Sequence, residues 1–280
     1  MLLIVGGESD PNTQRIVDQS HIRDVEYMFW DTDNDDCLQI AWDFDKPLLD
    51  LGDTQVTPTA IYLRWNVFGG QSEKNLAAFE MIQAYAFAWP EVRLLNRKTI
   101  VDINNKSLNL RLAREFGFTI PKTLVMSNFS PLKTIPDPET KIAKPLGGGA
   151  HTQSIADTTK HIEDGGTLPP QFIQELLPGE NLRLFSVGGE LSCFHLVTDQ
   201  LDYREDSAVD VIQVAVPEEL VAATNKLVAH KGFDYCALDF RCRSGFDDPI
   251  FLEINSFPMF VRFDDAGKNC IVNAILDFLV

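Results

Sequence analysis

The chain has 280 residues, of which 45% are hydrophobic and 23% are charged, as in an ordinary globular protein. No apolar run approaches the roughly 20 residues that a membrane span needs, so we expect no membrane partner. The net charge of -17 opposes binding to a nucleic-acid backbone, which requires a basic surface. It does not oppose binding of a nucleotide, because a few local cations can hold a triphosphate inside an acidic protein.

The start of the chain and its cysteines predict a cytoplasmic protein. The segment from Met1 to Gly7 lacks a basic flank and continues into acidic residues, which is typical of a first strand and not of a signal peptide. The five cysteines form no C-x-x-C pair and are odd in number, which favours reduced thiols. These features leave the oligomeric state open, including a homo-oligomer.

Strands and helices alternate in the first part of the chain. Strands are expected at 1–5, 25–29 and 60–64. A helix should begin after Asp10, a favourable N-cap that is followed by proline. A second helix is expected over 72–88, where Trp89-Pro90 ends it. This order of elements predicts a small α/β lobe over residues 1–92.

Strands predominate later in the chain. They are expected at 120–126, 141–145, 171–176, 182–187, 190–197, 211–215, 235–241 and 250–255, with helices at 217–231 and 267–278. An amphipathic helix is expected before them, over 104–116, with Gly117 as its C-cap. Its candidate core positions are Leu108, Leu110, Leu112 and Ala113.

A lysine followed by three glycines is the first candidate binding element. Lys144 would supply a point charge for phosphate oxygens. Gly147, Gly148 and Gly149 would let successive backbone N–H groups face an anion. The alternative is a flexible turn with a solvated lysine, and this segment alone does not decide between them. It is not a Walker A loop, because no Gly-Lys-Ser/Thr follows.

A mostly apolar strand that ends in a polar bend, Phe172 to Arg183, is the second candidate. A strand edge could offer backbone N–H and C=O groups to an adenine ring, and an acid a few residues later could accept hydrogen bonds from ribose. Alone, this segment is better explained as a strand followed by a charged turn.

Three polar residues on two neighbouring predicted strands form a candidate metal site. Glu253 and Asn255 are two residues apart on a strand, so their side chains project from the same face. If the strands pair symmetrically about a turn at 244–249, Asp239 lies directly opposite Glu253. Adjacent carboxylates repel each other, and a cation between them removes that cost. Oxygen ligands of this kind suit Mg²⁺. Flanking apolar residues disfavour the alternative, a solvated polar face.

Taken in their order along the chain, these segments resemble the ATP-grasp superfamily of carboxylate–amine ligases over about residues 93–280. The shared pattern comprises Asn105-Lys106, Lys144-Pro with its glycines, Gln174-Glu175-Leu-Leu177, Arg183 to Val187-Gly-Gly, and Asp239 with Leu252-Glu253-Ile-Asn255. The RimK-like branch is the most similar. It includes glutamate-adding ligases and the maturases that close ester or amide rings in microviridin-type peptides.

The resemblance implies an ATP-grasp fold of the α/β (α+β) class. A lobe at 1–92 would precede a central subdomain at 93–172 and a C-terminal subdomain at 173–280, which clamp ATP between antiparallel sheets. It also implies that Asp239, Glu253 and Asn255 hold one or two Mg²⁺ ions, or Mn²⁺.

The resemblance implies further roles for single residues. Lys106, Lys144 and the loop of Gly147, Gly148 and Gly149 would contact the ATP phosphates. The backbone around Gln174, Glu175, Leu176 and Leu177 would hold adenine, and Glu180 or Asn181 would hold ribose. Arg183 and Arg204 would lie near the phosphates or an acyl phosphate.

The sequence departs from the ATP-grasp pattern where the acceptor should enter. The glycine loop lacks the usual later glycine, and Ser-Phe-Pro-Met-Phe260 follows Asn255 where many relatives carry a Pro-Gly turn. Candidate substrate contacts are Arg64, Asn96 and Arg262. Arg64 is equally well explained as a buried or paired arginine, and Arg262 as an ion-pair partner of Asp264 or Asp265.

We therefore expect a ligase that uses ATP to turn a carboxylate into an acyl phosphate, and then joins it to an amine or a hydroxyl. The expected substrate is a peptide or a protein. Two alternatives stay open: a ligase for a small amino-acid or dipeptide metabolite, and a nucleotide-binding regulatory protein without catalysis. The complete set of Asp239, Glu253 and Asn255 disfavours the regulatory protein.

Overall fold

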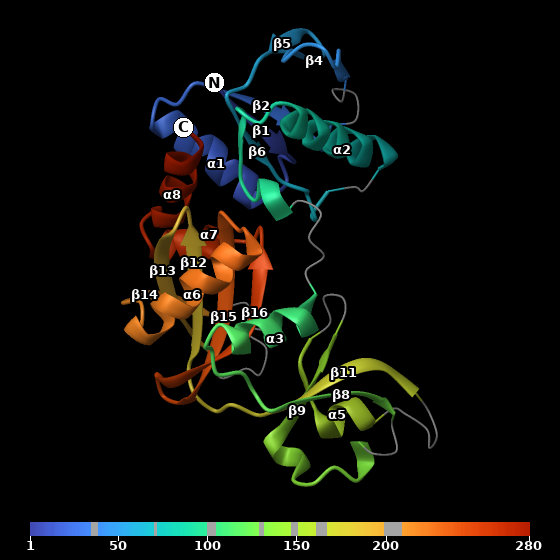
Figure 1. Cartoon of the computed structure of the whole chain (residues 1–280), viewed down its shortest axis with the longest axis vertical. Helices are drawn as coiled ribbons and strands as arrows, with labels where there is room; N and C mark the ends of the chain where they lie inside the picture. The colour runs from blue at the N-terminus through green and yellow to red at the C-terminus, as the bar shows by residue number, and fades with distance from the viewer. Residues whose placement is uncertain are drawn as a thin grey trace.

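A computed structural model describes residues 1–34, 39–69, 72–99, 105–128, 132–146, 151–160, 167–198 and 209–280. Three parts follow one another along the long axis of the molecule (Figure 1). An N-terminal lobe lies at one end, and a central lobe, which comes next in the sequence, lies at the other. A C-terminal sheet, formed last, lies between them.

The N-terminal lobe is built on a parallel sheet in the order β2–β1–β6–β7. Its elements are β1 (Leu2–Gly6), α1 (Pro11–Ile22), β2 (Tyr27–Asp31), β6 (Ala60–Leu63), α2 (Glu73–Ala88) and β7 (Arg93–Leu94). Asp10 accepts a hydrogen bond from the N–H of Asn12, which confirms the predicted cap of α1. A small antiparallel sheet was not predicted; its strands are β3 (Ala41–Trp42), β4 (Leu49–Leu51) and β5 (Thr54–Val56).

The central lobe is an antiparallel sheet in the order β10–β9–β11–β8. Its elements are β8 (Thr123–Asn128), the 3₁₀ turn Pro138–Thr140, β9 (Lys141–Pro145), β10 (Gln153–Ser154), α5 (Ile155–Thr159) and β11 (Thr167–Glu175). In the described part of this lobe the buried apolar cluster is small, and it consists of Leu132, Ala143, Ile155 and Ile173.

The C-terminal sheet is antiparallel throughout, in the order β14–β13–β12–β15–β16. Its strands are β12 (Asn181–Val187), β13 (Glu190–Val197), β14 (Asp210–Val214), β15 (Tyr235–Ser244) and β16 (Asp247–Ser256). The helices α3 (Lys106–Glu115) and α6 (Glu218–Lys231) pack on one face. The helices α7 (Val261–Ala266) and α8 (Cys270–Leu279) pack on the other; α7 was not predicted.

Strand pairing crosses both boundaries of the predicted division into three subdomains. β7, which follows residue 92, completes the sheet of the N-terminal lobe. β11 spans residue 172 and pairs with β9 through Glu175. The helix α3 packs against β16 and α6 of the C-terminal sheet. The division at 92/93 and 172/173 therefore stays a prediction.

One predicted core position, Leu108, is wrong, because its side chain is 50% exposed. Leu110 and Ala113 are buried as expected, and Leu112 is partly buried. Leu108 lies two residues before Leu110, which places it about 200° around the helix from that position. The buried face of α3 takes Asn109 instead.

None of the described helices is both long and apolar enough to cross a membrane. The cysteines that the structure describes, Cys193, Cys236, Cys242 and Cys270, are free thiols. Cys37 lies outside the described residues.

The N-terminal lobe and the C-terminal sheet share one apolar core, and α8 lies between them (Figure 1). Leu2, Ile4 and Ile16 of the lobe, Ile271, Ile275 and Leu276 of α8, and Phe185, Phe194 and Tyr235 of the sheet are all buried in this core. Since burial of apolar surface is the main favourable term in folding, we expect these two parts to unfold together.

Replacing Leu276 with alanine is expected to lower the free energy of unfolding by about 2–5 kcal/mol, because the side chain is fully buried and would leave a cavity. Denaturant unfolding followed by tryptophan fluorescence tests this. Trp30, Trp42, Trp65 and Trp89 all lie in the N-terminal lobe, so a shift reports that the lobe unfolds with α8.

The matched control for this prediction is Leu108→Ala, at an exposed leucine of another helix, which should change the free energy of unfolding by roughly 0.5 kcal/mol or less. A fluorescence transition that stays in place in Leu276→Ala, while circular dichroism shifts, would show that the two parts unfold independently.

Candidate active site

One row of the C-terminal sheet carries the charged residues of the site. Arg183 of β12 pairs with Asp239 of β15, and Asp239 pairs with Glu253 of β16, so their side chains lie on one face. The predicted pairing of Asp239 with Glu253 is confirmed. Asn255 pairs with Ala237 in the same register and projects from the same face. A register shift follows directly after the pair, as is common beside functional sites.

The amide of Asn255 connects the two carboxylates. Its Nδ2 atom lies 3.2 Å from Oδ2 of Asp239 and 3.4 Å from Oε1 of Glu253. A half-turn of the amide would direct Oδ1 to the same point, where oxygen atoms of three side chains would then converge. Carboxylate and amide oxygens are the ligands that Mg²⁺ and Mn²⁺ prefer. This donor set therefore fits a hard divalent cation.

Within the part of the chain that the structure describes, the other acidic, histidine and cysteine side chains offer no comparable site. In the described residues, no group of three or more His, Cys, Asp and Glu side chains is placed to hold a metal ion. A cation at Asp239 and Glu253 would therefore depend on Asn255, substrate phosphates and water for its other ligands.

Cations from three different elements surround the two carboxylates. Nζ of Lys144, on β9, lies 2.7 Å from Oε2 of Glu253. Nζ of Lys106, the first residue of α3, lies 3.6 Å from the same oxygen. Nη1 of Arg183 lies 3.1 Å from Oδ1 of Asp239. The site thus brings together Lys106 and Lys144, which the sequence had related only through a family resemblance.

The charge of Glu253 is set by these neighbours. Burial alone would raise the pKa of its carboxyl group, but Lys144 and Lys106, together with hydrogen bonds from Lys144 and Asn255, lower the pKa to about 2. Glu253 is therefore ionised at neutral pH and can bind a cation without first losing a proton.

A cleft lies between the central lobe and the C-terminal sheet, beside this charged row. It is lined by Pro121, Ile142, Lys144, Thr152 and residues 174–177 on the side of the central lobe, and by Asn181, Leu182, Leu196, Asp239, Phe240, Arg241, Leu252 and Glu253 on the side of the sheet. Apolar walls beside lysines and carboxylates suit a ligand that combines an apolar ring with a chelating phosphate chain. The cleft therefore fits ATP.

The predicted adenine segment lies in this cleft, and the side chains of Gln174 and Glu175 are engaged within the protein. Arg243 binds Glu175 through two hydrogen bonds of 3.0 and 3.2 Å. Burial raises the pKa of Glu175, but hydrogen bonds from Arg243 and from the N–H of Lys122 lower it by a larger amount. The pKa of Glu175 therefore lies below its ordinary value. Gln174 donates a hydrogen bond to Thr123. The ion pair of Glu175 with Arg243 ties the central sheet to the C-terminal sheet.

The predicted ribose residues lie next to each other, at the start of β12. Asn181 lines the cleft, and Oε2 of Glu180 lies 2.7 Å from Nε2 of His195 on the adjacent β13. The backbone of Glu180 is hydrogen-bonded to Cys242 and Gly245, so this bend is held against β15 and its turn.

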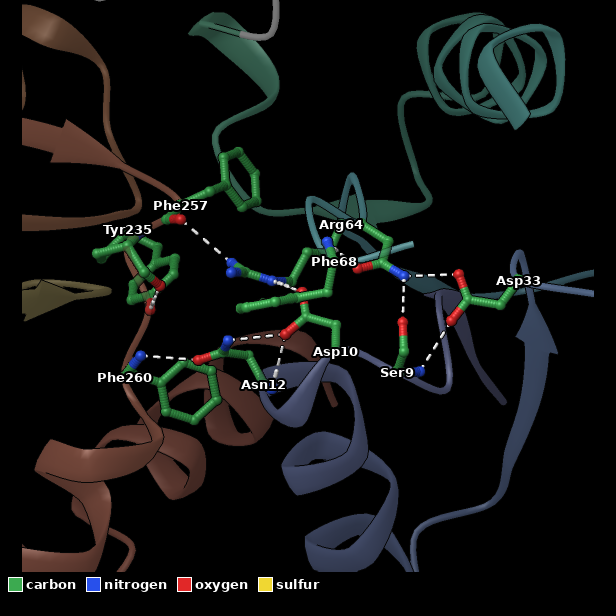
Figure 2. Close-up of polar contacts among 11 residues, drawn as sticks. Ser9, Asp10, Asn12, Asp33, Arg64, Phe68, Tyr235, Phe257 and Phe260 are labelled. Atoms are coloured by element: carbon green, nitrogen blue, oxygen red, sulfur yellow. Dashed lines mark hydrogen bonds and ion pairs between the residues drawn. The ribbon is translucent and has the colours of Figure 1, made fainter. Parts of the chain in front are cut away.

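Two of the predicted substrate contacts lie inside the protein, between the N-terminal lobe and the C-terminal sheet. Arg64 is buried; its Nε lies 2.6 Å from Oδ2 of Asp10, and it donates to the carbonyl of Phe257 (Figure 2). Asn96 is fully buried, and its amide donates to the carbonyl and accepts from the N–H of Tyr235. Both side chains join the two parts of the molecule.

The third predicted substrate contact, Arg262, is exposed on α7. The sequence also allowed an ion pair of Arg262 with Asp264 or Asp265. In the structure, Arg15 of α1 pairs with Asp264 at 3.6 Å and with Asp265 at 2.5 Å. This contact again joins the N-terminal lobe to α7.

Several solved structures resemble the whole chain. The ATP-grasp ligase PsnB, complexed with a minimal precursor, is 19% identical with a TM-score of 0.72, over 100% of this chain and 98% of PsnB. The macrocyclase MdnC from Microcystis aeruginosa MRC, bound with the precursor peptide MdnA, is 18% identical with a TM-score of 0.73, over 100% and 99%. A Chryseobacterium gregarium RiPP-associated ATP-grasp ligase, in complex with ADP and a leader and core peptide, is 19% identical with a TM-score of 0.71, over 99% and 96%.

The chain has the ATP-grasp fold. This confirms the predicted fold class. No protein-family model matches the sequence, and no curated protein matches it either. At this low identity the fold is recognised from the arrangement of its elements, which persists after most side chains have changed.

Within the ATP-grasp cleft, the structure adds residues that the sequence analysis missed. Arg241 lines the cleft, and Arg243 holds Glu175. The alternation of Asp239, Arg241 and Arg243 along one strand was the signal that could have revealed them, because such residues share a face. Gly147, Gly148, Gly149 and Arg204 lie outside the described residues, so their roles stay predictions.

Replacing Lys144 with methionine is expected to raise the pKa of Glu253 from about 2 toward its ordinary value, because the nearest cation is removed. In the parent protein, the folded pKa lies below the value of the unfolded chain. This pair therefore stabilises the fold above pH 4.5, and the stabilisation is lost as the pH falls toward 2.

A carbon-13 NMR titration of the glutamate carboxyl groups measures this change. Lys226→Met, at an exposed lysine of α6, is the control and should leave the Glu253 titration in place. An unchanged pKa of Glu253 in Lys144→Met would show that the lysine does not set its charge.

Proposed function

We propose that this protein is an ATP-dependent ligase that activates a carboxylate and joins it to an amine or a hydroxyl group, and that its substrate is a peptide. The observation that carries the proposal is the convergence of Asp239, Glu253 and Asn255 with Lys106 and Lys144 beside a cleft between two antiparallel sheets. This is the chemistry that a magnesium-bound triphosphate requires.

The charged row would hold the phosphates and the cation. Asp239, Glu253 and Asn255 would bind Mg²⁺, which supplies charge neutralisation to the phosphate oxygens when it is bound. In the structure, Glu253 is paired with Lys144 and Asp239 is paired with Arg183. When Mg-ATP binds, Lys144 would release Glu253 and contact a phosphate oxygen. Glu253 would then contact the cation in place of Lys144. Arg183 would keep Asp239 in place.

The cleft would hold the rest of the nucleotide. Since the side chains of Gln174 and Glu175 are engaged within the protein, adenine recognition at residues 174–177 would rest on the backbone. Apolar contact would come from Ile142, Leu182 and Leu252. The ribose hydroxyls would lie near Glu180 and Asn181.

The proposed reaction has two steps. A substrate carboxylate oxygen attacks the γ-phosphorus of ATP, the bond to the bridging oxygen breaks, and ADP leaves. An amine or hydroxyl then attacks the acyl carbon, and inorganic phosphate leaves with the former carboxylate oxygen while the nucleophile loses its proton. The protein contributes placement and charge neutralisation, and no side chain forms a covalent bond.

A peptide substrate is favoured by the relatives in the fold. PsnB, MdnC and the Chryseobacterium gregarium ligase have all been solved with precursor peptides or their leader and core segments. Coverage of the whole chain in each comparison, including the N-terminal lobe, supports a shared overall organisation.

The decisive experiment is a screen for ADP and phosphate release with Mg-ATP against pools of peptides and small carboxylates. Release that depends on a peptide supports the proposal, and a loss of one water from the peptide mass would identify ring closure. Release that depends only on an amino acid or dipeptide would instead indicate a metabolite ligase. ATP binding without release in any pool would indicate a regulatory nucleotide-binding protein.

Glu253→Ala and Lys144→Ala are each expected to lower the turnover of ATP by roughly 100-fold or more, the scale of losing one contact to the developing charge. Steady-state ADP release is the measurement. Glu219→Ala and Lys226→Ala remove an exposed acid and an exposed base from α6 and should keep near-normal turnover. Near-normal ADP release by both site variants would overturn the assignment of the charged row.

A further inference from the structure

A second hollow lies between the N-terminal lobe and the end of β16 with the segment that follows it. Ser256 and Phe257, the two residues after Asn255, line it. We call this hollow the apolar groove; its other main lining residues are Trp65, Val67, Phe79, Leu94 and Met259. Consecutive Cα atoms are about 3.8 Å apart, so the groove begins within one residue of the proposed cation site.

The residues of the apolar groove are partly open to solvent. Val67 is 53% exposed and Met259 is 48% exposed. Trp65 and Phe79 make an edge-to-face contact at 5.4 Å that forms a firm aromatic wall. Arg64 is the one charged residue among the described residues that line the groove, and its guanidinium binds Asp10 and the carbonyl of Phe257. The groove is therefore suited to an uncharged, apolar occupant.

The wall formed by residues 256–260 is held by a buried polar network (Figure 2). Arg64 donates to the carbonyl of Phe257 at 3.1 Å, and Asn12 accepts from the N–H of Phe260 at 2.8 Å. Phe257 has a φ of +54°, a strained conformation for a bulky residue. Such strain persists only where the surroundings impose it, and it is concentrated at functional sites.

The opposite wall, formed by residues 64–68, is fixed in the same way. Asn66 donates to Oδ1 of Asp33 at 2.6 Å and to Oγ of Ser9 at 2.9 Å, and its own oxygen accepts from the N–H of Phe68. Figure 2 shows the carboxylate of Asp33 directed toward Ser9, whose backbone N–H donates to Oδ2 of Asp33 at 2.8 Å. Both walls are therefore set before a ligand arrives, which reduces the ordering cost of binding.

We propose that the apolar groove binds one bulky aliphatic or aromatic side chain of the peptide substrate, next to the group that reacts. This assignment rests on the proposed ligase function. Two features of the groove's lining residues favour a substrate side chain as the occupant. Ser256 and Phe257, which line the groove, directly follow the proposed cation ligand Asn255 in the chain. The rim is apolar and half exposed, and Arg64, the charged lining residue, is engaged by Asp10 and Phe257. A side chain bound there would fix which carboxylate or acceptor of a peptide reaches the acyl phosphate.

Binding of a labelled peptide panel tests the proposal on the intact protein. The probes have the sequence Ala-Ala-Glu-X-Glu-Lys-Ala-Ala, with X as alanine, leucine, phenylalanine or aspartate. Burial of a large apolar side chain predicts that the leucine and phenylalanine peptides bind about ten-fold or more tightly than the alanine peptide. Fluorescence anisotropy with Mg²⁺ and a non-hydrolysable ATP analogue gives the affinities, and ADP release is measured in parallel with ATP.

Substitutions in the groove make the test specific. Met259→Asp places a carboxylate at the rim and should bring the leucine-to-alanine affinity ratio to about one. Val67→Asp on the opposite wall should do the same and serves if Met259→Asp fails to fold. Phe87→Asp is the matched control, because Phe87 is 47% exposed in the same lobe and does not line the groove. This variant should keep the parent ratio.

The peptide affinities test the groove assignment, and ADP release tests the ligase assignment. ADP release without a preference for leucine or phenylalanine would contradict the groove assignment and support the ligase assignment. The same holds if the preference persists in Met259→Asp and Val67→Asp. An apolar preference without ADP release would support side-chain binding in the groove but would contradict its role in a ligase substrate site. A parent dimer that becomes monomeric in Met259→Asp would assign the groove to a second copy of the chain, and would also overturn the proposal.

Discussion

The organisation of this protein depends on pairing charges at the edge of a buried sheet face. Asp239 and Glu253 are adjacent carboxylates on neighbouring strands, an arrangement that is unfavourable without cations. Arg183 comes from the same sheet, whereas Lys106 and Lys144 come from α3 and the central lobe. The two carboxylates therefore form ion pairs with residues of the C-terminal sheet, of α3 and of the central lobe. Because a buried ion is costly to leave unpaired, these contacts also resist separation of the central lobe from the sheet.

The charged row lies on the face of the C-terminal sheet that also carries Phe185 and Ala237, because side chains two residues apart on a strand share a face. One face packs on α3 and α6, and the other packs on α7, α8 and the N-terminal lobe. The lobe does more than cover the sheet. Through Asp10, Arg64 and Asn12 it holds the residues that follow Asn255, where the acceptor side of the reaction should lie. This explains why Arg64 and Asn96, polar residues that resembled substrate contacts, are buried between the two parts.

Much of the fold could be predicted from local pattern, and the exceptions have physical causes. Long strands with clear alternation, such as β12, β13 and β15, were found because a side-chain period of two is visible in the sequence. Leu108 was predicted in the core because it lies in a leucine-rich helix, but its angle around the helix places it outside the buried face. The short strands β3 to β5 carry too few residues to show a period. Arg243 was missed because its partner, Glu175, belongs to another sheet.

The sequence by itself determined the chemistry of the row: which residues share a strand face, and that Asp239 would lie opposite Glu253. Both follow from the two-residue period of a strand and a short turn, which are local properties. Only the tertiary structure decided that Lys106 and Lys144 meet at Glu253, that Arg64 supports the loop after Asn255, and that an apolar groove opens there. These contacts join residues far apart in the chain, and they arise from packing of separate elements, for which no local period exists.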